Sequence, residues 1–158
     1  MSLSFSRLTV FCKNAERSLA FYRDLLGLVV VEDKVIEGPA AGALLQLPPC
    51  RMRIIFLAPS GEAPVLVGLF EIDLADLVAM TPPAKRPATG QTSLVLETDE
   101  FDQLASRLEA AGVRFLTAPH RYVKPTASTR SPAGTYCQMI VYDPDDVLVG
   151  IHQILPLD

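Results

Sequence analysis

The sequence predicts an α+β protein, in which two tandem βαβββ modules form one concave cup of mixed β-sheet with the helices on the outside. The first observation is the order of elements, since a strand, a helix and three strands follow one another twice along the 158 residues. The second is a repeat, because VLVGLFEI at 65–72 returns as VLVGIHQI at 147–154. Similar segments in the same place of each half indicate an internal duplication. We therefore expect a single domain, 1–158, with a first module at 5–73, a linker at 74–90 and a second module at 91–156.

The first module begins with alternating residues at 6–12, which predict a strand. Asn14 can cap the helix that follows, and Gly27 lies where a helix end needs a left-handed residue. Breaks at glycine and proline then separate three predicted extended stretches. These stretches are 28–36 with 43–47 as its continuation, 52–57 and 65–72.

The second module repeats this order after a weak helical turn at 73–80 and an extended stretch at 81–90. Its predicted strands are 92–98, 113–118, 135–142 and 147–154. Asp99 is expected to cap its helix, which Gly112 ends. A long polar loop is expected at 120–134, and its basic residues favour either a solvated loop or a lid over an acidic ligand.

Composition excludes several classes of function. The chain has 14 basic and 18 acidic residues, a net charge of −4, which argues against nucleic acid or an anionic membrane as the main partner. Its 49% hydrophobic and 20% charged residues predict a filled core rather than disorder. No apolar run is long enough to span a bilayer, and residues 1–11 lack the pattern of a secretory signal. The three cysteines show no CxxC spacing, so we expect reduced thiols in a cytoplasmic protein.

Three segments carry a family resemblance. NAERSLAFYRDLLGL at 14–28, TDEFDQLASRLEAAGV at 98–113 and YDPDDVLVGIHQ at 142–153 closely resemble the vicinal-oxygen-chelate superfamily. That superfamily includes glyoxalase I, extradiol dioxygenases, fosfomycin-resistance enzymes and bleomycin-binding proteins. The resemblance implies the cup fold and a homodimer, but it leaves the chemistry open because the fold hosts enzymes and pure binders.

The resemblance also implies where a metal would be held. Its metal enzymes take ligands from the first and last strands of each module, and the matching positions here are Arg7, Gly68, Ser93 and Gly150. A guanidinium is cationic, glycine has no side chain, and serine alone is a poor ligand. We therefore expect no metal and no other cofactor.

Displaced ligands are the alternative to a lost metal site. Gln91 and Glu97 share one strand face with the serine position, and His152 lies two residues after the glycine of the last strand. Such a relocated site competes with a simpler interpretation, in which His152 is a half-buried imidazole with a local hydrogen bond.

Arg7 is the strongest candidate for ligand contact, because strand alternation places it on the cup face. It can hold a carboxylate or phosphate with two hydrogen bonds, or form an internal ion pair with an acid such as Glu71 or Glu97. No catalytic residue is assigned. The predicted ligand-binding residues are Arg7, Thr9, Phe11, Phe70, Ser93, Val95, Tyr136, Gln138, Leu148 and His152.

Three functions are compatible with these residues. The first is a metal-free cup that binds a small organic molecule, including one with an anionic group. The second is an enzyme, either a metal-dependent lyase or dioxygenase with displaced ligands or a metal-free catalyst that uses Arg7, His152 or Tyr136. The third is a subunit or sensor whose cup has lost its function.

Overall fold

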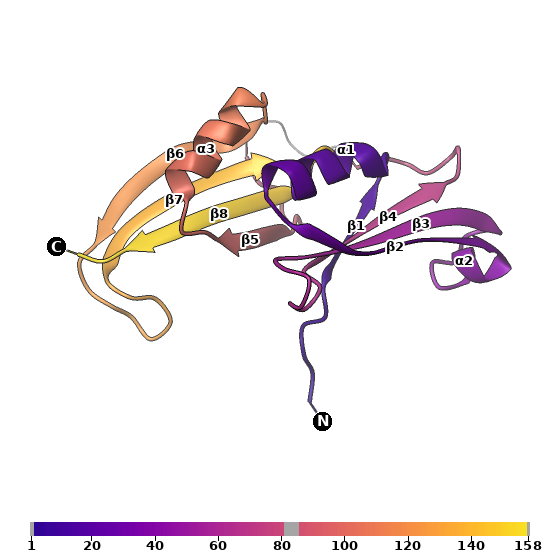
Figure 1. Cartoon of the computed structure of the whole chain (residues 1–158), viewed down its shortest axis with the longest axis horizontal. Coiled ribbons are helices and arrows are strands. Elements are labelled where there is room, and N and C mark those ends of the chain that lie inside the picture. The colour runs from indigo at the N-terminus through magenta and orange to yellow at the C-terminus, as the bar shows by residue number, and fades with distance from the viewer. Residues whose placement is uncertain (1, 81–85, 158) are drawn as a thin grey trace. The chain divides into compact units, whose positions relative to one another are not determined.

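The protein folds into two compact units, Met1–Met80 and Thr81–Asp158. The computed structural model describes residues 2–80 and 86–157. Each unit contains one four-stranded mixed sheet with a helix on one face (Figure 1). This confirms the predicted α+β class with two βαβββ modules. The extended stretch predicted at 81–90 lies in part outside the described residues.

The first unit has strand order β1-β4-β3-β2, with β1 parallel to β4 and the other pairs antiparallel. Its helical turns continue from α1 into a π-helical segment, η1. The elements are β1 (Leu8–Cys12), α1 (Ala15–Leu19), η1 (Ala20–Leu25), β2 (Val29–Gly38), α2 (Pro39–Ala43), β3 (Cys50–Ala58) and β4 (Val67–Asp73).

The ends of the first helical region follow the sequence prediction. The Asn14 side chain accepts a hydrogen bond of 2.9 Å from the amide of Arg17, which satisfies one of the free amides of the first turn. Gly27 has φ of +80°, the left-handed conformation that glycine adopts without a steric penalty.

The predicted continuation of the second strand at 43–47 is wrong. Strand β2 ends at Gly38, and Pro39 begins the short helix α2, where its missing amide is not needed. The chain then turns sharply through Gln46, which has φ of +56°. A side chain at Gly42 would meet the carbonyl oxygen of Leu47 at 2.7 Å, so this tight turn requires glycine there.

The second unit repeats the topology, with strand order β5-β8-β7-β6 and β5 parallel to β8. Its elements are β5 (Ser93–Glu97), α3 (Phe101–Ala110), β6 (Phe115–Lys124), β7 (Gly134–Tyr142) and β8 (Leu148–Leu155). The predicted cap at Asp99 is wrong, because the capping position is Glu100 and its amide donates to the hydroxyl of Thr98 at 3.1 Å. Gly112 ends the helix with φ of +69°.

The long polar loop predicted at 120–134 is also wrong in its first part. Strand β6 continues to Lys124, and it pairs with β7 from Phe115, without register shifts from His120 onward. The polar residues of this segment suggested a loop. They are compatible with a strand because β6 lies at the edge of its sheet and its side chains are mostly exposed. The remaining loop contains an isolated bridge between Ser128 and Ser131.

In the first sheet, ion pairs and hydrogen bonds show which face the helix covers. Glu71 accepts a 2.6 Å hydrogen bond from the amide of Ala15 in α1, and Arg53 contacts Glu16 of the same helix at 2.6 Å. Strand alternation therefore places Gly68 on the opposite face, together with its register neighbours Thr9 and Phe56. We call this face the free face of the first sheet, because α1 lies on the other side; Ala41 of α2 covers the part of it formed by Met52, Ile54 and Ile72.

The second sheet is oriented in the same way by its own contacts. Arg121 pairs with Asp102 of α3, and the Gln153 amide donates to the carbonyl of Asp99 at 2.8 Å. Side chains alternate between the two faces of a strand, so the neighbours of Arg121 in β6 and of Gln153 in β8 point away from α3. They form the free face of the second sheet. Gly68 pairs with Thr9 and Gly150 with Val95, the register that the internal repeat predicts.

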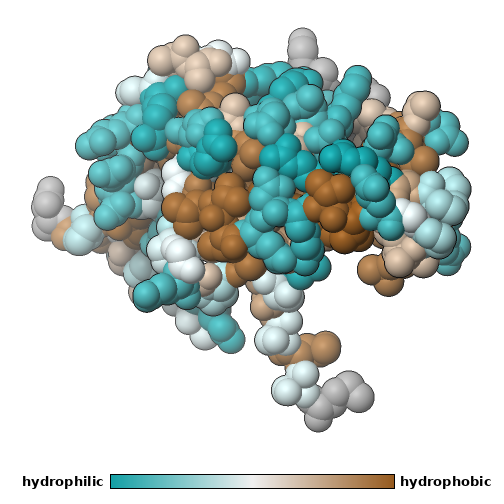
Figure 2. Space-filling model, turned by 45° about the vertical axis from the view of Figure 1, so that its right-hand side comes forward, coloured by the Kyte–Doolittle hydropathy of each residue, from teal (hydrophilic) through white to brown (hydrophobic). Residues whose placement is uncertain are grey.

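The core residues lie mainly on the helix-covered faces. Cys12, Cys50 and Cys137 are buried and free of disulfides. Figure 2 shows apolar patches between hydrophilic ones on the surface it presents. Within the described part of the chain, no helix has both the length and the hydropathy needed to cross a membrane.

Candidate functional site

Arg7 lies against aromatic rings on the free face of the first sheet. Its guanidinium carbon is 4.8 Å from the ring centroid of Phe56 and 6.0 Å from that of Phe70. These distances are typical of cation–π contacts. Such contacts orient the planar guanidinium but give no hydrogen-bond acceptor to its five N–H donors. Across residues 2–80 and 86–157 no ion pair to Arg7 is found. Glu71, one of the two acids considered as its partner, faces α1 instead.

The stem of Arg7 fills the space above Gly68. A Cβ atom at Gly68 would meet Arg7 Cδ at 3.2 Å, Phe70 Cε1 at 3.2 Å and Phe56 Cε1 at 3.3 Å. Gly68 is the position at which the resemblance implies an acidic metal ligand, and the space above it is occupied by the side chain of Arg7. At Gly150, the equivalent position of the second module, the nearest atom is Val95 Cγ2 at 3.6 Å.

Further aromatic and apolar side chains continue this surface. Phe11 is 50% exposed and meets Phe70 edge to face, with ring centroids 6.0 Å apart. Phe56 and Phe70 then pack against an apolar cluster that includes Ile54 and, from α2, Ala41. One cationic group, Arg7, therefore lies beside an apolar surface formed by Phe11, Phe56 and Phe70. This combination suits a small molecule with an anionic group and an apolar body.

A second cation lies near the same ring. Lys34 Nζ is 5.6 Å from the centroid of Phe56, and it forms a 2.7 Å ion pair with Glu32. Its charge is therefore compensated, whereas that of Arg7 is not. Of the two cations, Arg7 is the one whose charge has no acidic partner among the described residues.

A hollow of about 440 Å³ lies elsewhere in the first unit, at the far ends of β2, β3 and β4. Its residues are Glu37, Gly38, Pro49, Cys50, Arg51 and Asp73. The arginine here is already paired, since Arg51 lies 3.2 Å from Glu37. This hollow offers no unpaired cation comparable with Arg7.

On the second sheet, a polar row crosses the free face from strand to strand. Glu97 pairs in register with His152, His152 with Gln138, and Gln138 with His120. His152 and Gln138 are half-buried, while Glu97 and His120 are exposed. The row brings together two predicted residues, Gln138 and His152, and one acid from the displaced metal set.

A stack of aromatic rings lies beside this row. The rings of Tyr122 and Tyr136 are 5.2 Å apart at 19°, and those of His120 and Tyr122 are 6.1 Å apart at 25°. The Tyr136 hydroxyl donates a 2.8 Å hydrogen bond to the carbonyl of Pro132, which fixes that ring. Tyr136 is buried at 6% exposure, while Tyr122 is 41% exposed.

The displaced metal set is brought together only in part. Glu97 and His152 are neighbours, but the Gln91 side chain accepts a 3.0 Å hydrogen bond from the amide of Ala88 in a local turn. Among the residues that the structure describes, no group of three or more His, Cys, Asp or Glu side chains could hold a metal ion. The donor set on these two free faces does not fit a metal held by several protein ligands.

The remaining predicted residues lie on the two free faces by register. Thr9 pairs with Gly68, Val95 with Gly150, and Ser93 with Leu148. Val95 is 62% exposed, whereas Leu148 is buried at 4%. The Ser93 hydroxyl donates to the carbonyl of Leu94 at 3.3 Å.

Sequence reasoning missed three residues of these surfaces. Phe56 lies on a strand where apolar letters are continuous, so its role under Arg7 is not visible without the register. His120 and Tyr122 were expected in a loop. The aromatic letters of HRYVK, with β-branched Val123 beside Tyr122, were the available signal for an edge strand.

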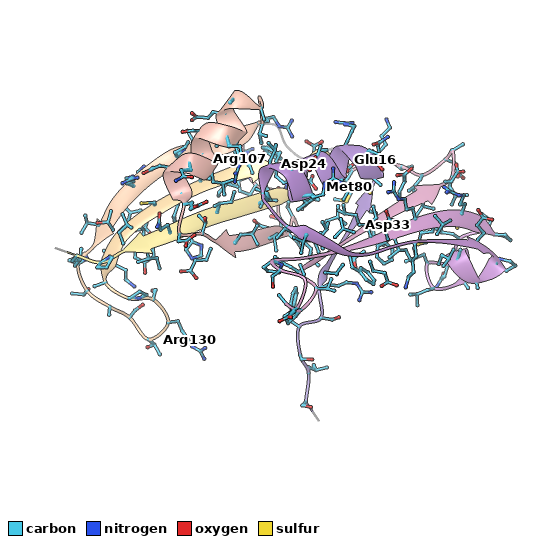
Figure 3. The ribbon with its side chains drawn as sticks, in the orientation of Figure 1. Glu16, Asp24, Asp33, Met80, Arg107 and Arg130 are labelled. Atoms are coloured by element: carbon cyan, nitrogen blue, oxygen red, sulfur yellow. The ribbon has the colours of Figure 1, made fainter. Side chains whose placement is uncertain are left out.

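On the sheets, the ionisable groups with shifted pKa values lie on the helix-covered faces. The bidentate hydrogen bonds from Arg53, at 3.0 and 2.7 Å, hold the pKa of Asp33 below its usual value. The hydrogen bond to Asp102 raises the pKa of Arg121. These groups tie strands to helices and stand away from the free faces; Glu16 and Asp33 are labelled in Figure 3.

The family is established by comparison with known proteins. The chain matches the family described as "Glyoxalase/Bleomycin resistance protein/Dioxygenase superfamily" over residues 4–151, and it belongs to that family. Among curated proteins, none matches at a significant level.

Solved structures share the fold at low sequence identity. A glyoxalase family protein from Bacillus cereus superimposes with a TM-score of 0.74 at 15% identity, covering 98% of this chain and 96% of that one. The trypanothione-dependent glyoxalase I of Leishmania major gives 0.60 at 13%, covering 96% and 87%. An antibiotic-binding protein from a Streptomyces species gives 0.54 at 22%, covering 98% of each chain. At these identities the likeness extends to the fold alone.

Proposed function

We propose that this protein binds a small organic anion on the free face of its first sheet, without a metal. The supporting observation is Arg7, whose guanidinium rests on Phe56 and Phe70 and has no acidic partner among the described residues. An uncompensated arginine beside apolar rings favours a carboxylate held by two parallel hydrogen bonds. The similarity in fold to an antibiotic-binding protein from a Streptomyces species supports a binding role.

The ligand's body is expected to be flat and apolar. Phe11 and Phe70 meet edge to face beside Arg7, and aromatic side chains accept flat rings by stacking or edge contact. An aryl carboxylate combines this body with the anionic group. Naphthoate is a suitable fluorescent probe of that class.

The test is a titration of the full chain with naphthoate. Arg7→Ala should weaken binding by about 10- to 100-fold, the range for a hydrogen-bonded charged group worth about 1.5–3 kcal/mol. Arg7→Lys should recover only part of the affinity, because an ammonium lacks the planar fork. Arg107→Ala is the matched control, since Arg107 is an exposed arginine of α3 (Figure 3).

Two results would contradict this function. One is naphthoate binding that Arg7→Ala and Arg107→Ala change equally. The other is an Arg7→Ala variant that melts at a lower temperature by circular dichroism yet binds naphthoate with unchanged affinity when folded, which would make Arg7 a structural residue.

A metal-dependent enzyme is the second candidate, and one observation favours it. Glu97 and His152 are register neighbours on the free face of the second sheet, so two potential ligands are adjacent. A lyase or dioxygenase would need further ligands beside them. Stoichiometric metal uptake that His152→Ala abolishes would favour this candidate over metal-free binding.

We also propose a cytoplasmic homodimer. The three buried, free cysteines support a reducing compartment. Each sheet has an edge strand with open hydrogen-bonding groups, β2 and β6, and edges of this kind are often covered by a second copy. Light scattering on the purified chain measures the oligomeric state, and a monomer at all concentrations would refute the dimer.

A further inference from the structure

We propose that the anion site of the first sheet prefers flat aromatic acids that carry a carboxamide at the end opposite the carboxylate. In this arrangement Arg7 holds the carboxylate, and the ion pair between Lys34 and Glu32 holds the amide. This preference rests on the proposed function and deepens it, because it names the class of acid that binds at Arg7. The placement of three charged groups around Phe56 and the balance of their charges support it.

Arg7 and Lys34 reach the ring of Phe56 from different strands. In the strand order β1-β4-β3-β2, Phe56 of β3 lies between Arg7, which precedes β1, and Lys34 of β2. The Arg7 guanidinium carbon is 4.8 Å from the ring centroid, and Lys34 Nζ is 5.6 Å from it. The two charges are therefore no farther apart than the sum of these distances. One benzene ring with a polar group at each end can bridge such a span across the half-buried ring of Phe56.

Glu32 and Lys34 lie together on the free face of the first sheet. Asp33 between them pairs with Arg53, which also contacts Glu16 of α1, so strand alternation directs Glu32 and Lys34 away from that helix. Lys34 donates a 2.7 Å hydrogen bond to Glu32 and, among the described residues, to no other group. An ammonium has three N–H donors, so two remain for a ligand.

A carboxamide matches this ion pair because it carries a donor and an acceptor side by side. Its carbonyl oxygen can accept a hydrogen bond from Lys34, and its N–H can donate to the carboxylate of Glu32. Both partners are charged, and hydrogen bonds to charged groups are stronger than those between neutral groups. A ketone at the same place would use the ammonium alone.

The balance of charge disfavours a second carboxylate in place of the amide. Arg7 and Lys34 carry two positive charges around Phe56, and Glu32 carries one negative charge, so a carboxylate bound at Arg7 already neutralises the sum. A second carboxylate would add an uncompensated charge beside Glu32, in a chain whose net charge is −4. A neutral amide avoids this repulsion and leaves Lys34 and Glu32 paired.

The test compares three acids of one shape by calorimetric titration of the full chain at low salt. These are para-carbamoylbenzoate, para-acetylbenzoate and terephthalate. The amide should bind about 5-fold more tightly than the ketone, as expected for one hydrogen bond to an exposed charged group. Terephthalate should bind more weakly than the amide. Equal affinities for the amide and the ketone, tightest binding of terephthalate, or no binding of any of the three acids would overturn the proposal.

Variants of the ion pair separate the two contributions. Glu32→Met should remove the preference for the amide over the ketone and make terephthalate the tightest of the three, because Lys34 is then uncompensated. Lys34→Met should weaken the amide and the ketone about 3- to 5-fold. Glu37→Met and Arg51→Met are the matched controls, since these residues form an exposed ion pair of 3.2 Å on the helix-covered face of the same sheet.

The controls should leave the order of the three acids unchanged. An amide preference that survives Glu32→Met, an amide preference that Glu37→Met removes equally, or unchanged affinities in Lys34→Met would each contradict the role of the ion pair. Both members of the pair are exposed, so these variants are expected to fold.

Naphthoate separates this preference from the proposed function. It has no second polar group, so Lys34→Met should change its affinity less than about 2-fold, whereas Arg7→Ala should weaken naphthoate and all three acids. If naphthoate depends on Arg7 but the amide preference is absent, anion binding stands and the role of the ion pair is wrong. If the acids bind without dependence on Arg7, both proposals are wrong.

Discussion

Exchanging Gly68 and Gly150 for alanine, one at a time, compares equivalent positions of the two modules. Both glycines lie in the last strand of their module and on its free face, and neither has a positive φ. A Cβ at Gly68 would touch Arg7, Phe70 and Phe56 at 3.2–3.3 Å, whereas at Gly150 the nearest atom is 3.6 Å away. The added methyl group is therefore crowded at Gly68, whereas at Gly150 it makes ordinary van der Waals contact.

The magnitudes follow from these contacts. Gly150→Ala should stabilise the protein by about 0.5–1 kcal/mol, because alanine loses less backbone freedom than glycine on folding. At Gly68 the same gain is offset by overpacking, whose cost starts at about 1 kcal/mol when a flexible side chain can move aside. We expect Gly68→Ala to be less stable than Gly150→Ala by about 1 kcal/mol, or roughly 2–4 °C in Tm for a chain of this size.

Binding gives the sharper readout. The atom that can move most easily from Gly68 is in the exposed stem of Arg7, so Gly68→Ala should displace its guanidinium and weaken naphthoate about 5-fold. Gly150→Ala should change this affinity less than about 2-fold. Calorimetric titration and thermal melts of both variants measure the two effects. Equal stability and equal affinity in the two variants would refute the placement of Arg7 over Gly68.

Four further predictions concern the scaffold and the metal. Arg53→Met should cost about 1–2 kcal/mol in denaturant unfolding, since it removes the hydrogen bonds that join β3 to β2 and α1; wild-type stability would contradict it. Because the folded pKa of Asp33 is lowered, the stability from this pair is present above the unfolded value of about 3.9 and is lost as the pH falls through the lower folded value. Wild type and Arg53→Met should therefore converge in acid, and a constant difference down to about pH 2 would argue against the pair. Asp143→Ala should cost about 2–3 kcal/mol, because this buried carboxylate accepts 2.8 Å hydrogen bonds from two backbone amides, and a loss within about 0.5 kcal/mol would refute this role. Dialysis against Ni²⁺ or Zn²⁺ should leave well below one ion per chain, and stoichiometric binding that His152→Ala abolishes would overturn metal-free binding.

Local signals in the sequence predicted much of the fold. Asn14, Gly27 and Gly112 have the capping roles expected of them, because capping depends on residues within one turn. The repeat placed Gly68 and Gly150 in equivalent register. The family signature then gave the topology, which local patterns alone could not distinguish from other α+β arrangements.

The errors occurred where tertiary contacts outweigh local pattern. The stretch after Gly38 reads as apolar and extended, but α2 folds back so that Ala41 packs on the apolar cluster of β3 and β4. The polar stretch from His120 to Lys124 is a strand because ring stacking and the pair between Arg121 and Asp102 support it from both faces. Long-range contacts of this kind have no signature in a short window of sequence.

Arg7 stands where the family resemblance implies a metal ligand, and a guanidinium at that position would support different chemistry from a metal ion. A divalent ion offers open coordination positions and polarises a bound oxygen as a Lewis acid. A guanidinium carries a single positive charge and N–H donors in a fixed planar arrangement. It stays protonated near neutral pH, so it cannot act as a general acid or base. Its contact with Phe56, at 4.8 Å, keeps that charge beside an apolar floor without an acid to neutralise it. Such a group can hold the anion of a ground-state ligand, and binding of that kind lowers a dissociation constant without itself accelerating a reaction. For this reason the residues around Gly68 favour binding over catalysis, and the naphthoate titration is the measurement that bears most directly on the protein's role.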